Sequence, residues 1–183
     1  MPVILGIAGS VRTRSYNASL LRAIVELAPD DCRVETASIA GIPLYDGDLE
    51  ESQGVPPVAA ALKDRIAAAD GLLLVTPEYN NSLPGAFKNA IDWLTRPSSD
   101  IPRVFGGRAI ALAGATPGPG GTRLSQTAWL TVLRVLGTRP FFGRGLFVSD
   151  AAKVFDAEGR LTDERVRDQV QKFIAGFAAF VKA

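Results

Sequence analysis

Val3-Ile4-Leu5-Gly6-Ile7-Ala8-Gly9-Ser10, at the start of the chain, is the stretch that decides the fold. Its unbroken apolar run predicts a strand that is buried on both faces, as in a parallel sheet covered by helices. Gly9 and Ser10 open a polar loop that leads to the N-terminus of a helix. Because the first N–H groups of a helix have no partner within it, such a loop favours the binding of an anion.

The same order, a short buried strand followed by a helix, recurs along the chain. The expected strands are residues 3–8, 33–39, 71–75, 108–113 and 141–148, the last one broken by glycines. The expected helices are residues 20–28, 58–69, 86–94 and 126–136, and a final helix that Thr162 caps. Five alternations predict one α/β domain over residues 1–183, a doubly wound five-stranded parallel sheet with strand order 2-1-3-4-5 and helices on both faces.

Composition excludes several kinds of chemistry. The chain has no histidine, so a Ser-His-Asp triad, a Cys-His pair and a histidine metal site are impossible. Cys32 is the only cysteine and is expected to be a buried thiol. The net charge is +1, and acidic and basic residues are mixed along the chain without forming a long basic stripe. Nucleic acid is therefore not an expected partner. The apolar runs are too short to span a membrane, and a cytoplasmic location is expected.

In a sheet of this kind, ligands bind at the carboxyl ends of the strands, so function is expected in the loops after the first, third and fourth strands. Residues 9–17 offer hydroxyl, amide and guanidinium donors that suit a phosphate. Residues 76–85 are stiffened by Pro77 and Pro84, which would direct the backbone N–H groups of Glu78, Tyr79 and Asn80 toward a planar heterocycle. Residues 114–123 are rich in glycine, so a ligand could approach their backbone closely.

Each loop alone also has a structural interpretation. The first could be a polar turn in which Asn17 caps the helix and the arginines are solvated, and the other two could be ordinary turns. Neither a P-loop nor a Gly-x-Gly-x-x-Gly motif occurs, which disfavours a direct nucleoside-triphosphate or Rossmann dinucleotide site. The role of residues 40–57, rich in Gly, Pro and acids, stays open.

With these loops, the sequence resembles the NADPH-dependent FMN reductase family, whose members have a flavodoxin-like fold and include quinone, chromate and azo-dye reductases. The resemblance rests on Gly9-Ser10-x-Arg12-x-x-Ser15-x-Asn17 and on the longer motif Pro77-Glu78-Tyr79-Asn80-x-Ser82-x-Pro84-Gly85. Lys88-Asn89-Ala90-Ile91-Asp92-Trp93 continues the second motif. The sequence of the third loop, residues 114–123, differs from the one usual in the family.

The resemblance implies FMN as cofactor, with NADPH or NADH as co-substrate. The residues that it implies in FMN binding are Ser10, Arg12, Ser15, Tyr16, Asn17, Pro77, Glu78, Tyr79, Asn80, Ser82, Gly114, Gly118 and Arg123. No side chain is expected as an obligatory acid or base, because the flavin supplies the chemistry. Arg12, Arg14 and Arg123 are candidates for reading the 2′-phosphate of NADPH. A homodimer or homotetramer is also implied.

The implied activity is hydride transfer from NAD(P)H through bound FMN to quinones, azo or nitro compounds, chromate or free flavin, by a ping-pong mechanism. The main alternative is a flavodoxin-type electron carrier that needs a separate reductase. Such carriers are usually strongly acidic, and 20 basic against 19 acidic residues speak against one here. A flavodoxin-like domain without flavin is a third interpretation, which three suitable loops at adjacent strand ends disfavour.

Overall fold

The computed structural model describes residues 1–183 and contains the expected parallel sheet. Its strand order is β2-β1-β3-β4-β5, and a short strand β6 also pairs with β4, so the predicted order is confirmed. All the pairs are parallel. The strands are β1 Val3–Ala8, β2 Arg33–Ala37, β3 Gly71–Val75, β4 Ala109–Ala115, β5 Arg139–Pro140 and β6 Leu146–Val148.

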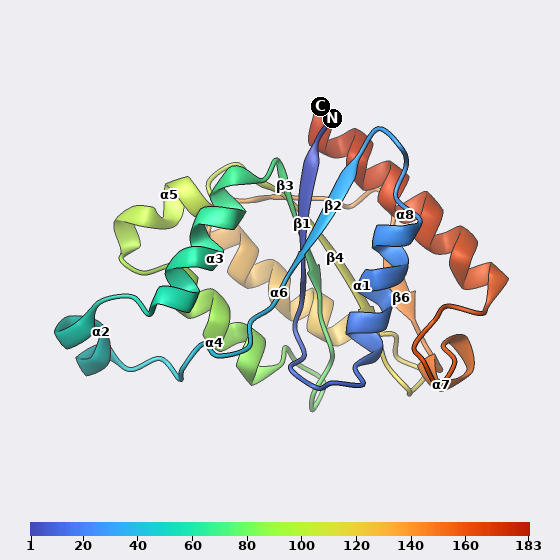
Figure 1. Cartoon of the computed structure of the whole chain (residues 1–183), viewed down its shortest axis with the longest axis horizontal. Coiled ribbons are helices and arrows are strands. Elements are labelled where there is room, and N and C mark those ends of the chain that lie inside the picture. Colours follow the sequence, from blue (N-terminus) through green and yellow to red (C-terminus); the bar gives the residue numbers. More distant parts are fainter.

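Helices cover both faces of the sheet, and the two chain termini lie side by side at its amino edge (Figure 1). On one face pack α1 (Tyr16–Glu26) and α8 (Glu164–Lys182), with the short α7 (Ala151–Val154) beside them. On the other face pack α3 (Pro57–Ala68), α4 (Gly85–Leu94), α5 (Ile101–Val104) and α6 (Arg123–Val135). A 3-10 turn, Ser98–Asp100, leads into α5.

Two apolar clusters form the core, one on each face of the sheet. Alternate residues of β3 enter opposite clusters: Leu73 and Val75 pack with α1 and α8, while Leu72 and Leu74 pack with α3, α4 and α6. This is why the strand reads as a continuous apolar run rather than an alternating one. Trp93 is fully buried, as expected of a core residue, and Cys32 is a buried free thiol.

Three local predictions are corrected. The fifth strand is split into β5 and β6, and residues 141–145 between them belong to neither, although the Phe141 N–H still donates to the Ile110 carbonyl of β4 at 2.7 Å. The final helix is capped by Asp163, whose carboxylate accepts from the Val166 N–H at 2.8 Å, while the Thr162 hydroxyl instead donates to the Val154 carbonyl. The helix expected from residue 126 begins three residues earlier, at Arg123.

The segment at residues 40–57 contains a helix, α2 (Gly47–Gln53), that projects from the body of the protein (Figure 1). Its side chains are not buried, so polar contacts hold it. Glu50 accepts from the Nε of Arg96 at 2.8 Å and from the hydroxyl of Tyr45 at 2.9 Å. Arg96 thereby lowers the pKa of Glu50, and Glu50 raises the pKa of Tyr45. No helix is long and apolar enough to cross a bilayer.

Candidate functional site

The loops after β1, β3 and β4 meet at the carboxyl edge of the sheet and enclose a small cleft. The enclosed space is about 70 Å³, which is the scale of a phosphate group rather than of a whole nucleotide. A larger ligand bound here would therefore extend over the open surface. The lining residues are Ser10, Arg12, Ser15, Tyr16, Asn17, Pro77, Glu78, Tyr79, Ala115, Thr116 and Pro117.

The first loop presents unpaired donors to this cleft. Ser15 is the N-cap of α1, and its Oγ accepts from the Ala18 N–H at 3.3 Å. The backbone N–H groups of Ser15, Tyr16 and Asn17 have no acceptor in the protein. The hydroxyl hydrogens of Ser10 and Ser15 are likewise uncommitted, since both oxygens only accept. Donors converging at a helix N-terminus are the arrangement that binds a phosphate.

Gly9 fixes the path of this loop by its closeness to α4. A Cβ at Gly9 would lie 2.0 Å from Cδ1 of Phe87, which is fully buried. The Gly9 N–H donates to the Val75 carbonyl at 2.8 Å, so the loop continues the register of β1 against β3. Glycine is therefore required by the close approach of backbone to ring.

Asn17 ties the first loop to the third. Its Nδ2 donates to the Ala115 carbonyl and its Oδ1 accepts from the Ala115 N–H, both at 2.9 Å. Because both polar atoms of the buried carboxamide are used in this way, only the backbone N–H of Asn17 remains for a ligand. The side chain thus acts by holding the cleft together, a role different from the one expected.

The second loop is a tight hairpin. The Tyr79 N–H donates to the Ser82 carbonyl at 3.1 Å, and the Ser82 N–H donates back at 3.0 Å. Asn80 and Asn81 have φ of 51° and 61°, the left-handed pair of a type I′ turn, which asparagine tolerates. The Tyr79 N–H is thus committed, and Asn80 and Ser82 lie in the hairpin outside the residues that line the cleft. The Tyr79 side chain is half exposed at the cleft.

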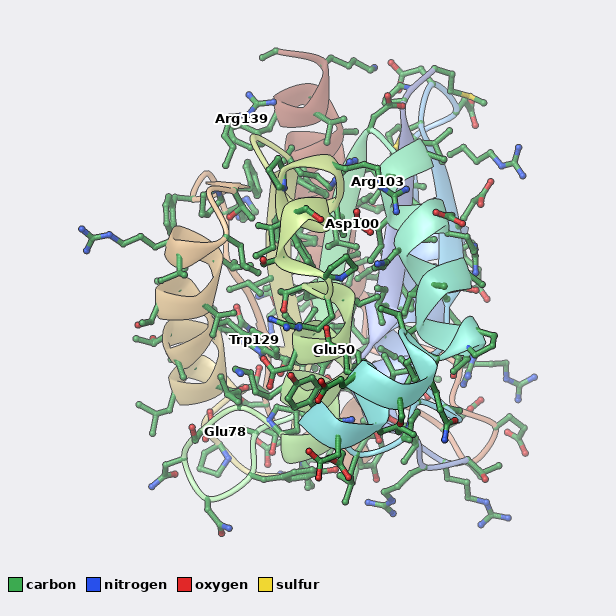
Figure 2. All side chains as sticks on the ribbon, turned by 90° about the vertical axis from the view of Figure 1, so that its left-hand side faces the viewer. Glu50, Glu78, Asp100, Arg103, Trp129 and Arg139 are labelled. Atoms are coloured by element: carbon green, nitrogen blue, oxygen red, sulfur yellow. The ribbon has the colours of Figure 1, made fainter.

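Glu78 joins the second loop to α6. Its Oε2 accepts from the N–H groups of Leu124 at 2.9 Å and Ser125 at 3.0 Å. The side chain of Thr122, the N-cap residue, accepts from the Gln126 carboxamide at 3.1 Å and caps no N–H group of the helix, so Glu78 is the capping group. This explains why α6 begins at Arg123. Figure 2 shows Glu78 below Trp129, at the N-terminal end of α6.

Thr76 adds a second link beneath Glu78. Its Oγ1 accepts from the Trp129 indole N–H at 3.0 Å and lies 2.9 Å from the Ser125 hydroxyl. All three residues are fully buried. The second loop is therefore held rigidly against the start of α6.

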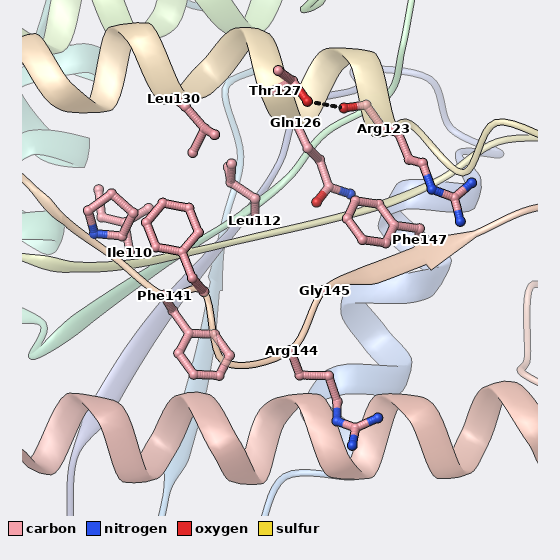
Figure 3. Close-up of a pocket in the computed structure, with 12 residues that line it drawn as sticks. Ile110, Leu112, Arg123, Gln126, Thr127, Leu130, Phe141, Arg144, Gly145 and Phe147 are labelled. Atoms are coloured by element: carbon pink, nitrogen blue, oxygen red, sulfur yellow. Dashed lines mark hydrogen bonds between the residues drawn. The ribbon is translucent and has the colours of Figure 1, made fainter.

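The remaining predicted residues lie apart from the cleft. A Cβ on Gly114 would lie 2.0 Å from the Thr122 hydroxyl, so this glycine serves close packing. The Gly118 N–H donates to Thr116 Oγ1 at 3.4 Å, and Gly118 does not line the cleft. The Arg123 guanidinium lies 5.1 Å from the centre of the Phe147 ring and lines a different pocket, between α6 and α8 (Figure 3).

Ala115, Thr116 and Pro117 line the cleft, although only their neighbours Gly114 and Gly118 were expected as site residues. The signal that could have identified them is position, since they lie at the carboxyl end of β4, as Ser10 lies just after β1 and Pro77 just after β3. The cleft thus takes residues from the carboxyl ends of three strands and from the first turn of α1.

The donor set fits FMN. Its phosphate needs several donors around a small space, which the first loop provides, and its ring needs room outside that space, which the open side toward Pro77 and Tyr79 provides. Ser10, Arg12, Ser15 and the N–H groups of Tyr16 and Asn17 would hold the phosphate. The residues from Pro77 to Tyr79 would border the ring.

Comparison with known proteins agrees with this geometry. A family model described as NADPH-dependent FMN reductase matches residues 2–153. An NAD(P)H-dependent FMN reductase of Pseudomonas aeruginosa is 38% identical over 179 residues, covering 98% of this chain and 95% of that protein. A 2-hydroxy-1,4-benzoquinone reductase of a Burkholderia species is 38% identical over 176 residues, covering 96% and 94%.

Among solved structures, FerB of Paracoccus denitrificans, a flavoenzyme NAD(P)H:(acceptor) oxidoreductase, matches with a TM-score of 0.88 and 32% identity, covering 100% of this chain and 98% of that chain. Fold, cleft and relatives together define the class: a flavodoxin-like oxidoreductase that uses FMN and NAD(P)H. More specifically, the chain belongs to the NADPH-dependent FMN reductase family, which confirms the resemblance seen in its loops.

Proposed function

We propose that this enzyme binds FMN with the phosphate in the cleft of the first loop, and that it passes electrons from NAD(P)H to a small quinone by a ping-pong mechanism. The observation that carries the proposal is the set of unpaired donors, from Ser10 to Asn17, around a space of phosphate size. The second loop, fixed to the start of α6 through Glu78 and Thr76, gives the ring a fixed border.

The protein's part in the reaction is to bind FMN and to leave the flavin accessible to the two substrates. When bound, FMN supplies the hydride and electron chemistry, so no protein acid or base is required of a chain without histidine. Arg12 and the helix N-terminus offset the phosphate charge. The half-exposed Tyr79 lies at the mouth of the cleft, where it leaves access for NAD(P)H and the acceptor in turn.

The first experiment is titration of the purified protein with FMN, followed by NADPH or NADH without oxygen. We expect stoichiometric binding and rapid loss of the flavin absorbance with no added reductase. Arg12→Ala should weaken FMN binding about 10-fold, while Arg134→Ala, a matched loss of charge on α6 at a side chain that makes no hydrogen bond or ion pair, should leave it unchanged. Binding that is insensitive to Arg12 would place the phosphate elsewhere.

Steady-state kinetics test the order of events. Double-reciprocal plots against NAD(P)H at several quinone concentrations should be parallel, because the two substrates use one site alternately. Intersecting lines would show that both substrates are bound together and would contradict the ping-pong scheme.

A quinone is proposed as the acceptor because a relative of 38% identity is named a 2-hydroxy-1,4-benzoquinone reductase. A hydroxylated benzoquinone should be reduced with a kcat/KM at least tenfold above that of an azo dye, a nitro compound, chromate or free flavin. A higher kcat/KM for any of those would assign the enzyme to that acceptor class instead.

We also propose that the enzyme is a homodimer or homotetramer. The supporting feature is Phe142, 74% exposed beside the apolar pocket between α6 and α8. An exposed ring next to an apolar hollow marks a contact surface. Sedimentation should show an oligomer that Phe142→Asp dissociates, whereas a wild-type monomer would refute the proposal.

A further inference from the structure

A second polar pocket lies on the outer side of the first loop. It measures about 310 Å³ and is bounded by that loop, by α1 and by the turn at residues 156–159. Arg12 and Arg14 line it from the loop, and Arg22 lines it from α1. Arg12 also lines the flavin cleft, so the two sites are adjacent.

The basic residues of this pocket outnumber its acidic residues. Arg12, Arg14 and Arg22 take part in none of the ion pairs of the structure. The pocket also contains Asp156 and Glu158, but both are paired with a single guanidinium, that of Arg160, at 2.7 Å and 3.0 Å.

Asp156 is further satisfied from the backbone of its own turn. Its Oδ1 accepts from the N–H groups of Glu158 at 3.0 Å and of Arg160 at 2.8 Å. The carboxylate is thus held by the turn and by Arg160, and it is not bonded to the three arginines. The pocket therefore presents an excess of positive charge.

Arg22 is held in position without losing its charge. Its Nη2 donates to the Ser19 hydroxyl at 3.0 Å and to the Gly159 carbonyl at 3.4 Å, both of which are neutral acceptors. A Cβ on Gly159, where φ is +75°, would lie 2.5 Å from this nitrogen. The turn and the guanidinium are thus packed closely, which fixes Arg22 for a ligand before the ligand arrives.

We propose that Arg14 and Arg22 bind a phosphomonoester in this pocket, and that its source is the 2′-phosphate of NADPH. The inference rests on the proposed function, because it concerns the co-substrate of the adjacent flavin cleft. A dianionic phosphate is matched by planar guanidinium groups, which donate paired hydrogen bonds. Since NADH lacks only this phosphate, the pocket sets the preference between the two nucleotides.

Of the arginines that the sequence made candidates for this role, Arg123 lies elsewhere. It packs over Phe147 and donates to the Gly120 carbonyl at 3.2 Å. Arg22, which sequence reasoning did not select, takes its place because it lies on α1 and lines this pocket together with the first loop.

Calorimetry on the FMN-loaded protein tests the site directly. Adenosine 2′-monophosphate should bind, whereas adenosine should not. The affinity for adenosine 2′-monophosphate should fall at least about 10-fold in the Arg14→Ala/Arg22→Ala double variant. Arg134→Ala, with the same loss of charge per position at an exposed site on α6, should bind it as the wild type does. Equal binding by wild type and double variant would overturn the proposal.

Kinetics distinguish the source of the phosphate. The double variant should lose at least about 10-fold in kcat/KM with NADPH and less than 2-fold with NADH. If it loses affinity for inorganic phosphate while the NADPH-to-NADH ratio is unchanged, the pocket holds free phosphate and the assignment to NADPH is wrong. Equal losses with both nucleotides would also overturn it.

Two controls keep the result unambiguous. Arg14 is exposed and makes no recorded contact, so Arg14→Ala alone tests the site even if removing Arg22 disturbs the turn. A protein that oxidises neither nucleotide would refute the proposed function, while binding of adenosine 2′-monophosphate would still decide whether this pocket exists as a phosphate site.

Discussion

The carboxamide of Asn17 and the backbone of Ala115 form a closed pair of hydrogen bonds, each of 2.9 Å, across 98 residues of sequence. One side chain thus satisfies both polar groups of a residue at the carboxyl end of β4. The cleft is consequently built on a bond between its first and third loops, and its shape depends on that bond as much as on the residues that would touch the ligand.

Asn17→Ala should destabilise the protein and weaken FMN binding together. The substitution leaves the buried N–H and carbonyl of Ala115 without partners, which costs about 1–3 kcal/mol for each unsatisfied group. Urea unfolding of the protein without FMN measures the stability. Asn17→Asp keeps an acceptor for the N–H but faces the carbonyl with a second acceptor, so it should also be destabilising. An unchanged midpoint in both variants would show that the pair contributes nothing.

Glu78→Ala should loosen the start of α6 and lower stability by about 0.5–2 kcal/mol, the usual effect of losing a helix cap. Amide exchange at Leu124 and Ser125 should become faster, because these N–H groups lose their acceptor. Glu51→Ala provides the control, since Glu51 is exposed and makes no recorded bond. Faster exchange along the whole of α6 but not at its first turn would argue against capping.

The fold could be predicted from the sequence because each strand and helix is marked by residues within its own short segment. The runs at residues 3–8 and 71–75 have the length and composition of buried strands, and their order limits the topology. The break in the fifth strand was harder to place, because the aromatic residues after Pro140 have the composition of a strand and Phe141 still donates to the Ile110 carbonyl of β4. Thr162 and Asp163 are both good caps, so sequence alone did not separate them.

The candidate site was predicted less completely, because its connections are long-range. Nothing in the local sequence of Glu78 signals that it caps a helix 46 residues away, or that Asn17 pairs with Ala115. The first positions after β1 and β3 were identified from composition and resemblance. Arg123 was misplaced because a polar residue in a glycine-rich loop suggests a ligand contact, whereas its guanidinium packs on an aromatic ring.

The hairpin of the second loop should respond to backbone geometry rather than to side-chain contacts. Asn81 has φ of 61°, so Asn81→Gly should be tolerated, while Asn81→Val should cost about 1–3 kcal/mol because a β-branched residue is strained there. Thermal unfolding compares the two variants. Equal stabilities would indicate that the turn changes type at no cost.

The ion pair between Lys63 and Asp100 should make stability depend on pH in the acid range. Lys63 is buried, its Nζ lies 2.6 Å from the Asp100 carboxylate, and this bond lowers the pKa of Asp100 from its ordinary value of 3.8. A second cation, Arg103, lies 3.4 Å from the same carboxylate. Figure 2 labels Asp100 and Arg103 near each other. Because the folded pKa is depressed, the contribution is fully present above the unfolded pKa and is lost as pH falls through the folded value.

Asp100→Asn removes this dependence. Below pH 3.8 the wild type should lose stability more steeply than the variant, and above it the variant should be uniformly less stable. Urea midpoints measured from neutral pH downward test this. Parallel curves for the two proteins at acid pH would contradict the assignment.

The contact between Gly9 and Phe87 links the first loop to the core, and a double-mutant cycle measures it. Gly9→Ala places a Cβ 2.0 Å from the Phe87 ring, a clash that forces ring or loop to move and costs about 1–3 kcal/mol. Because the loop carries the phosphate donors, FMN affinity should fall along with stability.

Phe87→Leu removes ring atoms from the space that the new methyl group needs. The double variant should therefore be more stable than the sum of the single effects and should recover part of the FMN affinity. Strict additivity, with no recovery of FMN binding, would mean that Gly9 positions the loop by some means other than its contact with Phe87.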